Sequence, residues 1–389
     1  MQRALPRHPV WDIQPESLLG RKAFRLDPGL KEELKRARIQ GQVIVVTGAA
    51  GFIGSELCRQ IAALDPKALV GFDQAETPLF LLEKELSAKF PGVAFYPELG
   101  NAVRSEDAHR IFARHRPSIV YHTSAYKHVS MMERNVGAAV ENNVLATWRM
   151  ARAAAAGGVE TFVLVSSDKA VCPASVMGAT KRVAELAIRC FEQEPGTKFV
   201  AVRFGNVLGS SGSALPIFQQ QIAAGGPITV THPEMSRYFM TASEAAQLVL
   251  HTSALGAGGE VFIFDLGEPI RILDLATNLI ERCGLSAGRD IAIEFIGMQP
   301  GEKLSEQMHL ASEVPVPTRV PGISCLVSSE QPDKERMRSL LRALEEVAEA
   351  RDDLSMILLL KEAVPDYTPV SEALKVIAMA SHQDPTHHF

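Results

Sequence analysis

A glycine-spaced turn between a short apolar run and a helical period is the feature that most constrains how this chain can fold. The turn reads Thr47-Gly48-Ala49-Ala50-Gly51-Phe52-Ile53-Gly54 and directly follows the apolar residues 43–46, which are typical of a buried β-strand. Glycines at this spacing let the backbone approach a pyrophosphate, and the N-terminus of the following helix attracts its charge. The turn therefore predicts a dinucleotide site, with a purely structural glycine turn as the alternative.

An acidic residue at the end of the second predicted strand, residues 68–72, indicates which dinucleotide binds. Asp73 lies close to the expected ~20 residues beyond the glycines, where a carboxylate accepts hydrogen bonds from both ribose hydroxyls and repels a 2′-phosphate. No Arg or Lys closely follows Asp73. The predicted cofactor is therefore NAD rather than NADP.

Short β-branched runs alternate with helical periods from residue 42 onwards. The predicted strands are residues 43–46, 68–72, 93–96, 119–122, 161–165 and 199–202. Their continuous apolarity indicates burial on both faces, as in a parallel sheet. The predicted fold class is therefore α/β, a doubly wound parallel sheet of the Rossmann type with a smaller C-terminal α/β substrate domain.

Changes in this rhythm suggest domain boundaries. We expect a helical leader over residues 1–40, a dinucleotide-binding domain over 41–205 to which later segments return, a mainly substrate-binding domain over 206–310, and a linker with a C-terminal helical segment over 311–389. Pro315, Pro317 and Pro321 indicate the linker. We expect a homo-oligomer, although for the C-terminal helix itself packing on its own domain is favoured over an oligomer contact.

Composition argues against several classes of function. A net charge of −5 over 389 residues gives no support to nucleic-acid binding. The apolar stretches are far shorter than the ~18 residues of a membrane helix, and residues 1–19 lack the apolar core of a signal peptide. The five cysteines are scattered without metal-ligand spacing. We therefore expect a cytoplasmic protein with no membrane span and no metal site.

Reactive side chains gather directly after the fifth predicted strand, residues 161–165. The sequence there is Ser166-Ser167-Asp168-Lys169, and Lys181 follows on the next predicted helix. Side chains at the C-terminal ends of parallel strands face the ligand crevice. A hydroxyl, a carboxyl and an amine there offer a hydrogen-bonding group, an acid and a base. A turn capped by Asp168, with Lys169 as its ion-pair partner, is an equally consistent structural interpretation.

Together with the glycine turn, these residues resemble an extended short-chain dehydrogenase/reductase. More narrowly, about residues 10–370 are similar to the UDP-N-acetylglucosamine 4,6-dehydratases of polysaccharide biosynthesis. The similar stretches are Ser124-Ala125-Tyr126-Lys127-His128-Val129, Ser167-Asp168-Lys169-Ala170-Val171, Met177-Gly178-Ala179-Thr180-Lys181, Arg203-Phe204-Gly205-Asn206-Val207 and Pro300-Gly301-Glu302-Lys303. Leu18-Leu19-Gly20-Arg21 resembles the end of a leader that follows a membrane-spanning part in long family members. We expect a naturally short member or an excised catalytic region.

The resemblance implies a reaction and the residues that perform it. Hydride leaves C4 of the sugar for the nicotinamide, the ketone at C4 acidifies the C5 proton, water is lost across C5 and C6, and the hydride returns to C6. NAD is recycled and stays bound. By this resemblance Asp168 is the acid at C6, Lys169 is the base at C5, and Lys181 binds the nicotinamide ribose.

The resemblance also implies the binding residues. Cofactor contacts are expected from Gly48, Ala50, Gly51, Phe52, Ile53, Gly54, Asp73, Asn101, Ala102, Ser124, Ala125, Asn143, Ser166 and Lys181. Contacts with a UDP-sugar are expected from Lys127, His128, Asn206, Arg237 and Glu302, with Arg237 at the diphosphate. For His128 a hydrogen-bonded structural role is the more common alternative.

Met177 is the main departure from the superfamily pattern. A tyrosine four residues before the lysine ordinarily takes the proton of the hydroxyl being oxidised, and methionine cannot do so. The dehydratases that the chain resembles also carry methionine here. The C4 proton acceptor is therefore open, with Asp168, assisted by Ser167, as the candidate. Milder departures are Asn101 for an adenine-binding aspartate, Cys172 for asparagine and Gln299 for arginine.

Other functions stay open on these residues. A nucleotide-sugar epimerase or a 5,6-dehydratase would begin with the same oxidation. A cofactor-binding regulator without turnover belongs to a different class. Met177 favours that class, whereas Asp168, Lys169 and Lys181 oppose it.

Overall fold

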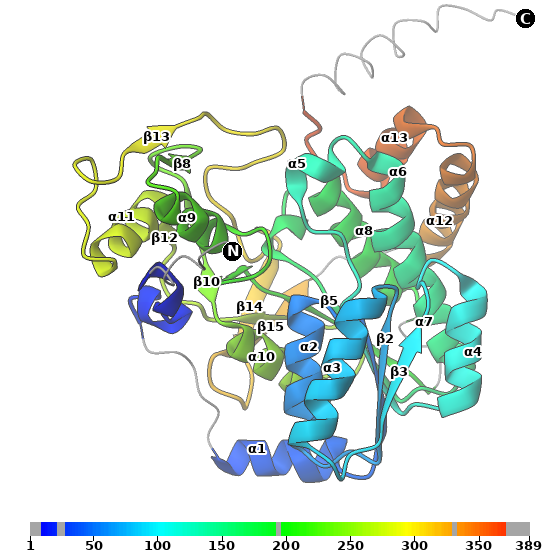
Figure 1. Cartoon of the computed structure of the whole chain (residues 1–389). Coiled ribbons are helices and arrows are strands. Elements are labelled where there is room, and N and C mark those ends of the chain that lie inside the picture. Colours follow the sequence, from blue (N-terminus) through cyan, green and yellow to red (C-terminus); the bar gives the residue numbers. More distant parts are fainter. Residues whose placement is uncertain (1–8, 22–27, 192–195, 329–332, 371–389) are drawn as a thin grey trace, which may run out of the picture.

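The computed structural model describes residues 9–21, 28–191, 196–328 and 333–370. In this part of the chain nine strands form one sheet, in the order β14-β15-β11-β6-β5-β4-β1-β2-β3 (Figure 1). The strands are β1 (Val43–Thr47), β2 (Ala68–Asp73), β3 (Phe95–Leu99), β4 (Ile119–His122), β5 (Thr161–Val165), β6 (Lys198–Arg203), β11 (Val261–Phe264), β14 (Glu313–Pro317) and β15 (Ile323–Ser328). Strands β1 to β6 and β11 pair in parallel, whereas β15 is antiparallel to β11 and β14.

The strand order reverses between β1 and β4, the position where open α/β sheets bind ligands. Val45 of β1 pairs with Val70 of β2 and Val120 of β4, and all three side chains are fully buried. Burial on both faces explains why these strands read as unbroken apolar runs. The predicted doubly wound parallel sheet is confirmed.

The third strand differs from its predicted range. The sequence predicts residues 93–96, whereas β3 spans Phe95–Leu99. This strand lies at the edge of the sheet, where Tyr96 and Leu99 are exposed. Pro97 is tolerated there because an edge strand has no second neighbouring strand to receive a backbone N–H. An edge strand lacks the continuous apolar signal of a central strand, so its range is harder to predict.

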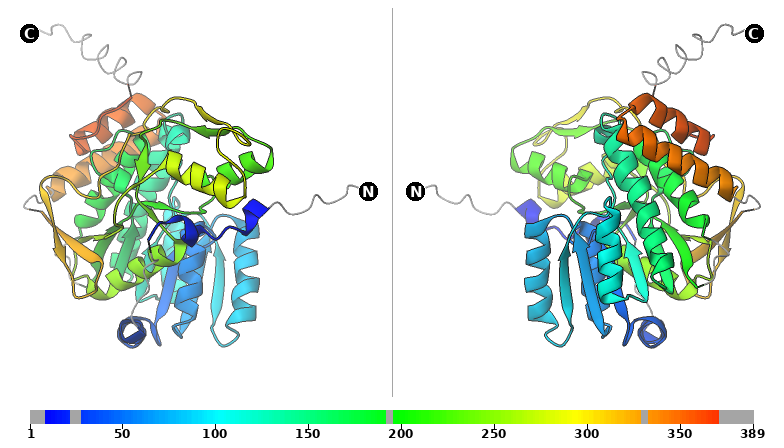
Figure 2. Two further views of the ribbon diagram at one scale, coloured as in Figure 1. Left: turned by 90° about the vertical axis from the view of Figure 1, so that its left-hand side faces the viewer. Right: turned by 90° about the vertical axis from the view of Figure 1, so that its right-hand side faces the viewer.

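Helices cover both faces of the sheet (Figures 1 and 2). Helices α2 (Phe52–Ala62), α3 (Glu76–Lys89) and α10 (Ala242–Leu255) pack on one face. Helices α4 (Ser105–His115), α7 (Ala146–Ala156) and α8 (Val176–Arg189) pack on the other. Shorter helical segments are α5 (Val129–Met132), α6 (Val136–Ala139), the π-helix η4 (Val140–Leu145) and the 3-10 turn η5 (Asp168–Ala170). Helix α2 begins directly after Gly51, so its N-terminus opens beside the C-terminal end of β1.

A smaller lobe follows β6 and lies beside the sheet (Figures 1 and 2). It contains β7 (Asn206–Val207), α9 (Ala214–Ala223), β8 (Ile228–Val230), β9 (Ser236–Arg237), β10 (Phe239–Met240), β12 (Ile270–Arg271), α11 (Ile272–Arg282) and β13 (Ile293–Phe295). Two 3-10 turns of the leader, η1 (Pro9–Asp12) and η2 (Pro15–Leu18), also contribute to its core. The buried residues are Val10 of η1, Leu18 of η2 and Leu19, which follows η2. Helix α1 (Pro28–Leu34) and the π-helix η3 (Lys35–Ile39) contact α10 instead. The described parts of the leader therefore contact both lobes.

The C-terminal part departs from the predicted linker. Residues 313–328 form the hairpin of β14 and β15. Proline has no backbone N–H to donate. Because β14 is an edge strand with a neighbouring strand on one side only, it tolerates Pro315 and Pro317. Helices α12 (Lys334–Glu349) and α13 (Asp353–Ala363) follow and pack on α8, and α12 also contacts η4. The predicted packing of the C-terminal helix on its own domain is thus confirmed.

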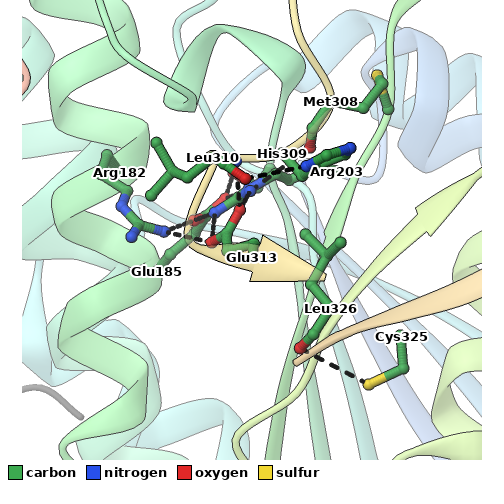
Figure 3. Close-up of polar contacts among 10 residues, drawn as sticks. Arg182, Glu185, Arg203, Met308, His309, Leu310, Glu313, Cys325 and Leu326 are labelled. Carbon is green, nitrogen blue, oxygen red and sulfur yellow. Dashed lines mark hydrogen bonds and ion pairs between the residues drawn. The ribbon is translucent and has the colours of Figure 1, made fainter. Parts of the chain in front are cut away.

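A buried ion cluster joins β14 of this hairpin to β6 and α8 (Figure 3). The guanidinium of Arg203, at the end of β6, donates to the carboxylate of Glu185 on α8 at 2.9 and 2.8 Å. It also donates to Glu313 on β14 at 2.6 and 3.0 Å. Arg182 donates to both carboxylates, at 2.9 and 3.5 Å. Burial raises the pKa of Glu185, but the two guanidiniums outweigh burial and lower it to about 2.

Replacement of Arg203 tests the importance of this cluster. Arg203→Met leaves two buried carboxylates without their main partner, so we expect the free energy of unfolding to fall by about 3–5 kcal/mol. Urea unfolding followed by circular dichroism measures the change. Arg271→Met is the matched control, because Arg271 forms only an exposed ion pair with Asp274. Equal effects of the two substitutions would contradict the prediction.

Candidate active site

The glycine turn leaves β1 at the C-terminal edge of the sheet. Gly48 has a φ of 65°, in the left-handed region, and a Cβ there would lie 2.8 Å from the backbone nitrogen of Ser124. A Cβ on Gly54 would lie 2.0 Å from the carbonyl oxygen of Gly48. Both positions therefore require glycine, Gly48 because residues 123–124 after β4 pack on the turn and Gly54 because α2 does. The result is a surface of backbone groups at a helix N-terminus, which suits an anion.

Asp73 ends β2 beside this turn. Its Oδ2 accepts the N–H of Ala50 at 2.9 Å, and its Oδ1 accepts the N–H of Ala75 at 2.9 Å. A carboxylate oxygen can accept more than one hydrogen bond, so both oxygens keep acceptor capacity toward a ligand. The acid and the glycine turn form one connected unit.

A cleft of about 590 Å³ extends from the glycine turn to the smaller lobe. Most of the predicted site residues line it, namely Gly48, Gly51, Phe52, Ile53, Gly54, Asp73, Asn101, Ala102, Ser124, Ala125, Lys127, His128, Ser166, Ser167, Lys169, Met177, Lys181 and Asn206. They come from segments that follow the C-terminal ends of neighbouring strands, and from α8. The fold therefore brings the predicted cofactor and substrate residues together.

Polar side chains meet where β5 ends. Asp168 is fully buried, and its Oδ1 accepts hydrogen bonds from Ser167 Oγ at 2.8 Å and from Lys169 Nζ at 3.2 Å. Lys169 Nζ also donates to Asn206 Oδ1 at 3.0 Å. None of the described residues makes a hydrogen bond to Asp168 Oδ2. An acid and an amine are thus in direct contact, and one carboxylate oxygen keeps its capacity to carry a proton.

Lys181 and Ser166 line the cleft between α8 and β5. Lys181 Nζ donates to the carbonyl oxygen of Val165 at 2.6 Å. Burial lowers the pKa of Lys181 to about 8, although the carboxylate of Glu185 opposes this shift. Ser166 Oγ donates to Glu185 at 2.5 Å, so its oxygen is left as an acceptor.

Lys127 and His128 line the cleft after β4. Burial lowers the pKa of Lys127. Burial lowers the pKa of His128 as well, and the charge of Lys127 adds to that shift. The His128 ring packs so closely on the neighbouring loop that a Cβ on Gly212 would lie 2.6 Å from its Cε1. This packing leaves the His128 side chain at the cleft.

Some predicted site residues are not part of the cleft lining, namely Ala50, Asn143, Asp168, Arg237 and Glu302. Asn143 clamps the backbone of Tyr126, accepting its N–H at 2.8 Å and donating to its carbonyl at 3.0 Å. Arg237 donates to the carbonyl oxygens of Lys303 and Leu304, at 2.8 and 3.2 Å. Glu302 accepts the N–H of Gln299 at 2.8 Å. The side chains of Asn143, Arg237 and Glu302 thus bond backbone groups near the cleft, whereas that of Asp168 bonds Ser167 and Lys169.

Sequence reasoning missed other residues at the site. Glu306 is buried, and its Oε1 lies 3.8 Å from Lys169 Nζ. It follows the stretch that ends at Lys303 but belongs to no helix or strand, so no periodicity marked it. Residues 210–213 also line the cleft. These serines and the glycine directly precede α9. Their position before a helix was the sequence signal that could have identified them.

Two properties of the described residues bear on other predictions. None of their helices has the length and apolarity that crossing a membrane requires. They also contain no group of three or more His, Cys, Asp or Glu side chains that could hold a metal ion. The cysteines, all five within the described part, are free.

The fold and cleft match a known family. The family model described as "Polysaccharide biosynthesis protein" matches residues 44–327, so the chain belongs to this family. It is 47% identical to the probable polysaccharide biosynthesis protein EpsC of Bacillus subtilis, over 78% of this chain and 50% of EpsC. It is 45% identical to the capsular polysaccharide biosynthesis protein CapD of Staphylococcus aureus, with the same coverages. The chain thus spans about half the length of these relatives.

Solved structures agree with this assignment. Pen from Bacillus thuringiensis is 30% identical, with a TM-score of 0.68 over 78% of this chain and 98% of Pen. DesIV, a dTDP-glucose 4,6-dehydratase from Streptomyces venezuelae solved with NAD and TYD bound, is 19% identical with a TM-score of 0.60 over 69% of this chain and 88% of DesIV. The second likeness shows the fold alone. The resemblance to the polysaccharide-biosynthesis family is confirmed.

The pKa of Lys181 predicts a pH dependence of stability. Between about pH 8 and the ordinary lysine value of 10.5, the unfolded chain binds more protons than the folded protein. The contribution of Lys181 to the free energy of unfolding therefore rises with pH through this window. We expect the wild type to gain roughly 2–4 kcal/mol relative to Lys181→Met from pH 8 to pH 10.5. Urea unfolding of both proteins across this range measures it, and parallel curves would contradict the prediction.

Proposed function

We propose that this chain catalyses the NAD-dependent 4,6-dehydration of a UDP-sugar, with UDP-N-acetylglucosamine as substrate and the 4-keto-6-deoxy sugar as product. The observation that carries the proposal is the 3.2 Å contact between the buried carboxylate of Asp168 and the amine of Lys169, next to the cleft that contains the glycine turn. Loss of water across two adjacent carbons needs an acid and a base side by side.

NAD fits the residues of this cleft. Because Gly48 and Gly54 leave no room for a Cβ, the pyrophosphate would meet backbone N–H groups at the start of α2. Asp73 would accept the hydroxyls of one ribose, and Lys181 would donate to the nicotinamide ribose. When bound, NAD supplies a hydride acceptor for C4 of the sugar and a hydride donor for C6.

The chain's own residues would move the protons. Ionised Asp168, with Ser167 holding its Oδ1 at 2.8 Å, accepts the proton of the C4 hydroxyl during oxidation. Lys169 then takes the C5 proton, and the electron pair of that C–H bond forms the C5–C6 double bond. The C6–O bond breaks, and Asp168 gives its proton to the leaving hydroxyl, which departs as water. In this scheme oxidation at C4 supplies the proton that elimination at C6 consumes, so Met177 need not act as an acid or base.

The proposed substrate contacts are Lys127, His128 and Asn206, because they line the same cleft as Lys169. Asn206 also binds Lys169 Nζ and would orient the base. Arg237 and Glu302 bind backbone groups here, so their proposed role is to support the loop beside the substrate. UDP as the nucleotide is supported by relatives such as the UDP-glucose 4-epimerase of Rickettsia typhi, 33% identical over 50% of this chain and 57% of that protein.

That relative also makes an epimerase the second candidate. An epimerase oxidises the sugar at C4 but returns hydride to the same carbon, so it needs no acid for a leaving hydroxyl. The contact of Asp168 with Lys169 favours elimination over this alternative. A 5,6-dehydratase would leave an alkene, and a regulator without turnover would change no sugar.

The free cysteines fit a reducing compartment, so the proposal places the protein in the cytoplasm. Self-association stays a prediction from sequence.

Mass spectrometry of reaction products tests the proposal directly. Incubation with UDP-N-acetylglucosamine is expected to yield a product lighter by one water, with a ketone at C4, and without consumption of added NAD. A panel of UDP- and dTDP-sugars gives the substrate range. Retention of the substrate mass with inverted stereochemistry would identify an epimerase, and an unchanged panel would reject enzymatic turnover.

Replacement of the proposed base separates cofactor binding from elimination. Lys169→Ala removes the amine that takes the C5 proton, so we expect water loss to fall by roughly 100-fold or more. Binding of NAD, measured by calorimetry, is expected to change little because the glycine turn and Asp73 are untouched. Turnover at the wild-type rate would remove Lys169 from the mechanism.

A further inference from the structure

Glu306 places a second carboxylate beside the proposed base. Its Oε1 lies 3.8 Å from Lys169 Nζ, and its Oε2 lies 3.2 Å from Lys303 Nζ. The side chain of Glu306 is only 3% exposed, so water screens these charges little. Lys169 Nζ therefore lies near two carboxylates, 3.2 Å from Asp168 Oδ1 and 3.8 Å from Glu306 Oε1.

Backbone contacts on both sides hold Glu306 in this position. The carbonyl oxygen of Met308 accepts from Arg203 at 3.5 Å, and the N–H of Leu310 donates to Glu313 at 2.8 Å (Figure 3). The segment that follows Glu306 is thus attached to the buried ion cluster. On the other side, Lys303 Nζ donates to the carbonyl oxygen of Val171 at 2.7 Å, close to Lys169 in sequence. Glu306 therefore has little freedom to move away from Lys169.

We propose that Glu306 is a positioning residue for Lys169, whose carboxylate stabilises the ammonium that forms when Lys169 takes the C5 proton. This inference rests on the proposed function and adds a residue to it. As the C5–H bond breaks, the proton and a positive charge arrive at Lys169 Nζ. A carboxylate fixed nearby in a buried site lowers the energy of that charge and keeps the amine directed at its target.

Lys303 offsets part of the negative charge of Glu306. Without it, Glu306 would favour a charged Lys169 before the reaction, and a charged amine cannot act as a base. With Lys303 on its other oxygen, Glu306 keeps an ion-pair partner while Lys169 is neutral. When Lys169 becomes charged and Asp168 gives up its proton, the numbers of positive and negative charges in the group are again equal. Elimination therefore moves protons without leaving an unpaired charge.

Other titratable groups face the same cleft, and they set the background for any pH dependence. They are Asp73, Tyr126, Lys127, His128 and Lys181. Burial lowers the pKa of both Lys127 and Lys181, so these two amines can also titrate in an alkaline pH profile. Substitution of Glu306 leaves all of them in place, so a shift between variant and wild type reports on Glu306 itself.

The pH profile of water loss tests the proposal with two opposed substitutions. Glu306→Gln removes the stabilising charge, so Lys169 becomes neutral at lower pH. The midpoint of the alkaline rise in kcat is expected to move down by about one pH unit, and the plateau to fall by roughly tenfold because the base is weaker. Lys303→Met removes a cation, so the midpoint is expected to move up. Glu294→Gln, an exposed carboxylate in the smaller lobe, is the control.

Competitive acetylation of Lys169 across the same pH range provides a readout that needs no turnover, because only a neutral amine reacts. Peptide mass spectrometry quantifies the label. Labelling that moves to lower pH in Glu306→Gln and to higher pH in Lys303→Met supports the inference. If both follow the wild type, the inference is overturned, whatever the activity. If labelling shifts as expected but the wild type dehydrates no nucleotide sugar, the proposed function fails while the pairing of Glu306 with Lys169 stands. Should Glu306→Gln not fold, Lys303→Met alone decides the result by the direction of its shift.

Discussion

The buried guanidinium of Arg203 is the interaction on which the geometry of the cleft depends. It joins α8, which carries Lys181, to the segment between Glu306 and Glu313. A charge buried this deeply is tolerated only when its partners are placed well, and here both oxygens of each carboxylate accept from it. The reactive groups at the surface of the cleft therefore rest on a network behind it. A small displacement of α8 relative to β14 would therefore change the positions of Ser166 and Glu306 together.

The arrangement of charge around Lys169 suits a reaction that moves protons in pairs. Asp168 and Glu306 flank the amine, while Lys303 balances Glu306. In the proposed cycle the oxidation step protonates Asp168, and the elimination step returns that proton and charges Lys169. An epimerase would make no use of such a relay. In this proposed cycle Met177 need not act as an acid or a base.

The central strands and the glycine turn were predictable because their physical signals are local. A strand buried on both faces must be apolar throughout, and a turn beneath a helix must lack Cβ atoms at Gly48 and Gly54. The signals failed at the sheet edge, where β3 shifted and β14 formed from a stretch that reads as a proline-rich linker. An edge strand accepts proline and exposed side chains, so its sequence does not distinguish it from a loop. At the site, Arg237 and Asn143 were matched by type to ligand-binding roles, and the folded chain adds bonds from both to backbone groups that the sequence did not indicate.

By itself the sequence determined the fold class, the position of the dinucleotide turn and the pairing of Asp168 with Lys169 next to it. Each follows from residues close together along the chain, whose mutual distances are limited by covalent geometry. Only the tertiary structure decided that Glu306 lies beside Lys169 and that Glu313 shares the guanidinium of Arg203 with Glu185. These contacts join segments far apart in sequence, and buried ion pairs form only once the surrounding core has excluded water. The polar residues after β5 can therefore be identified from the local sequence. The charged residues that surround them come together only in the folded chain.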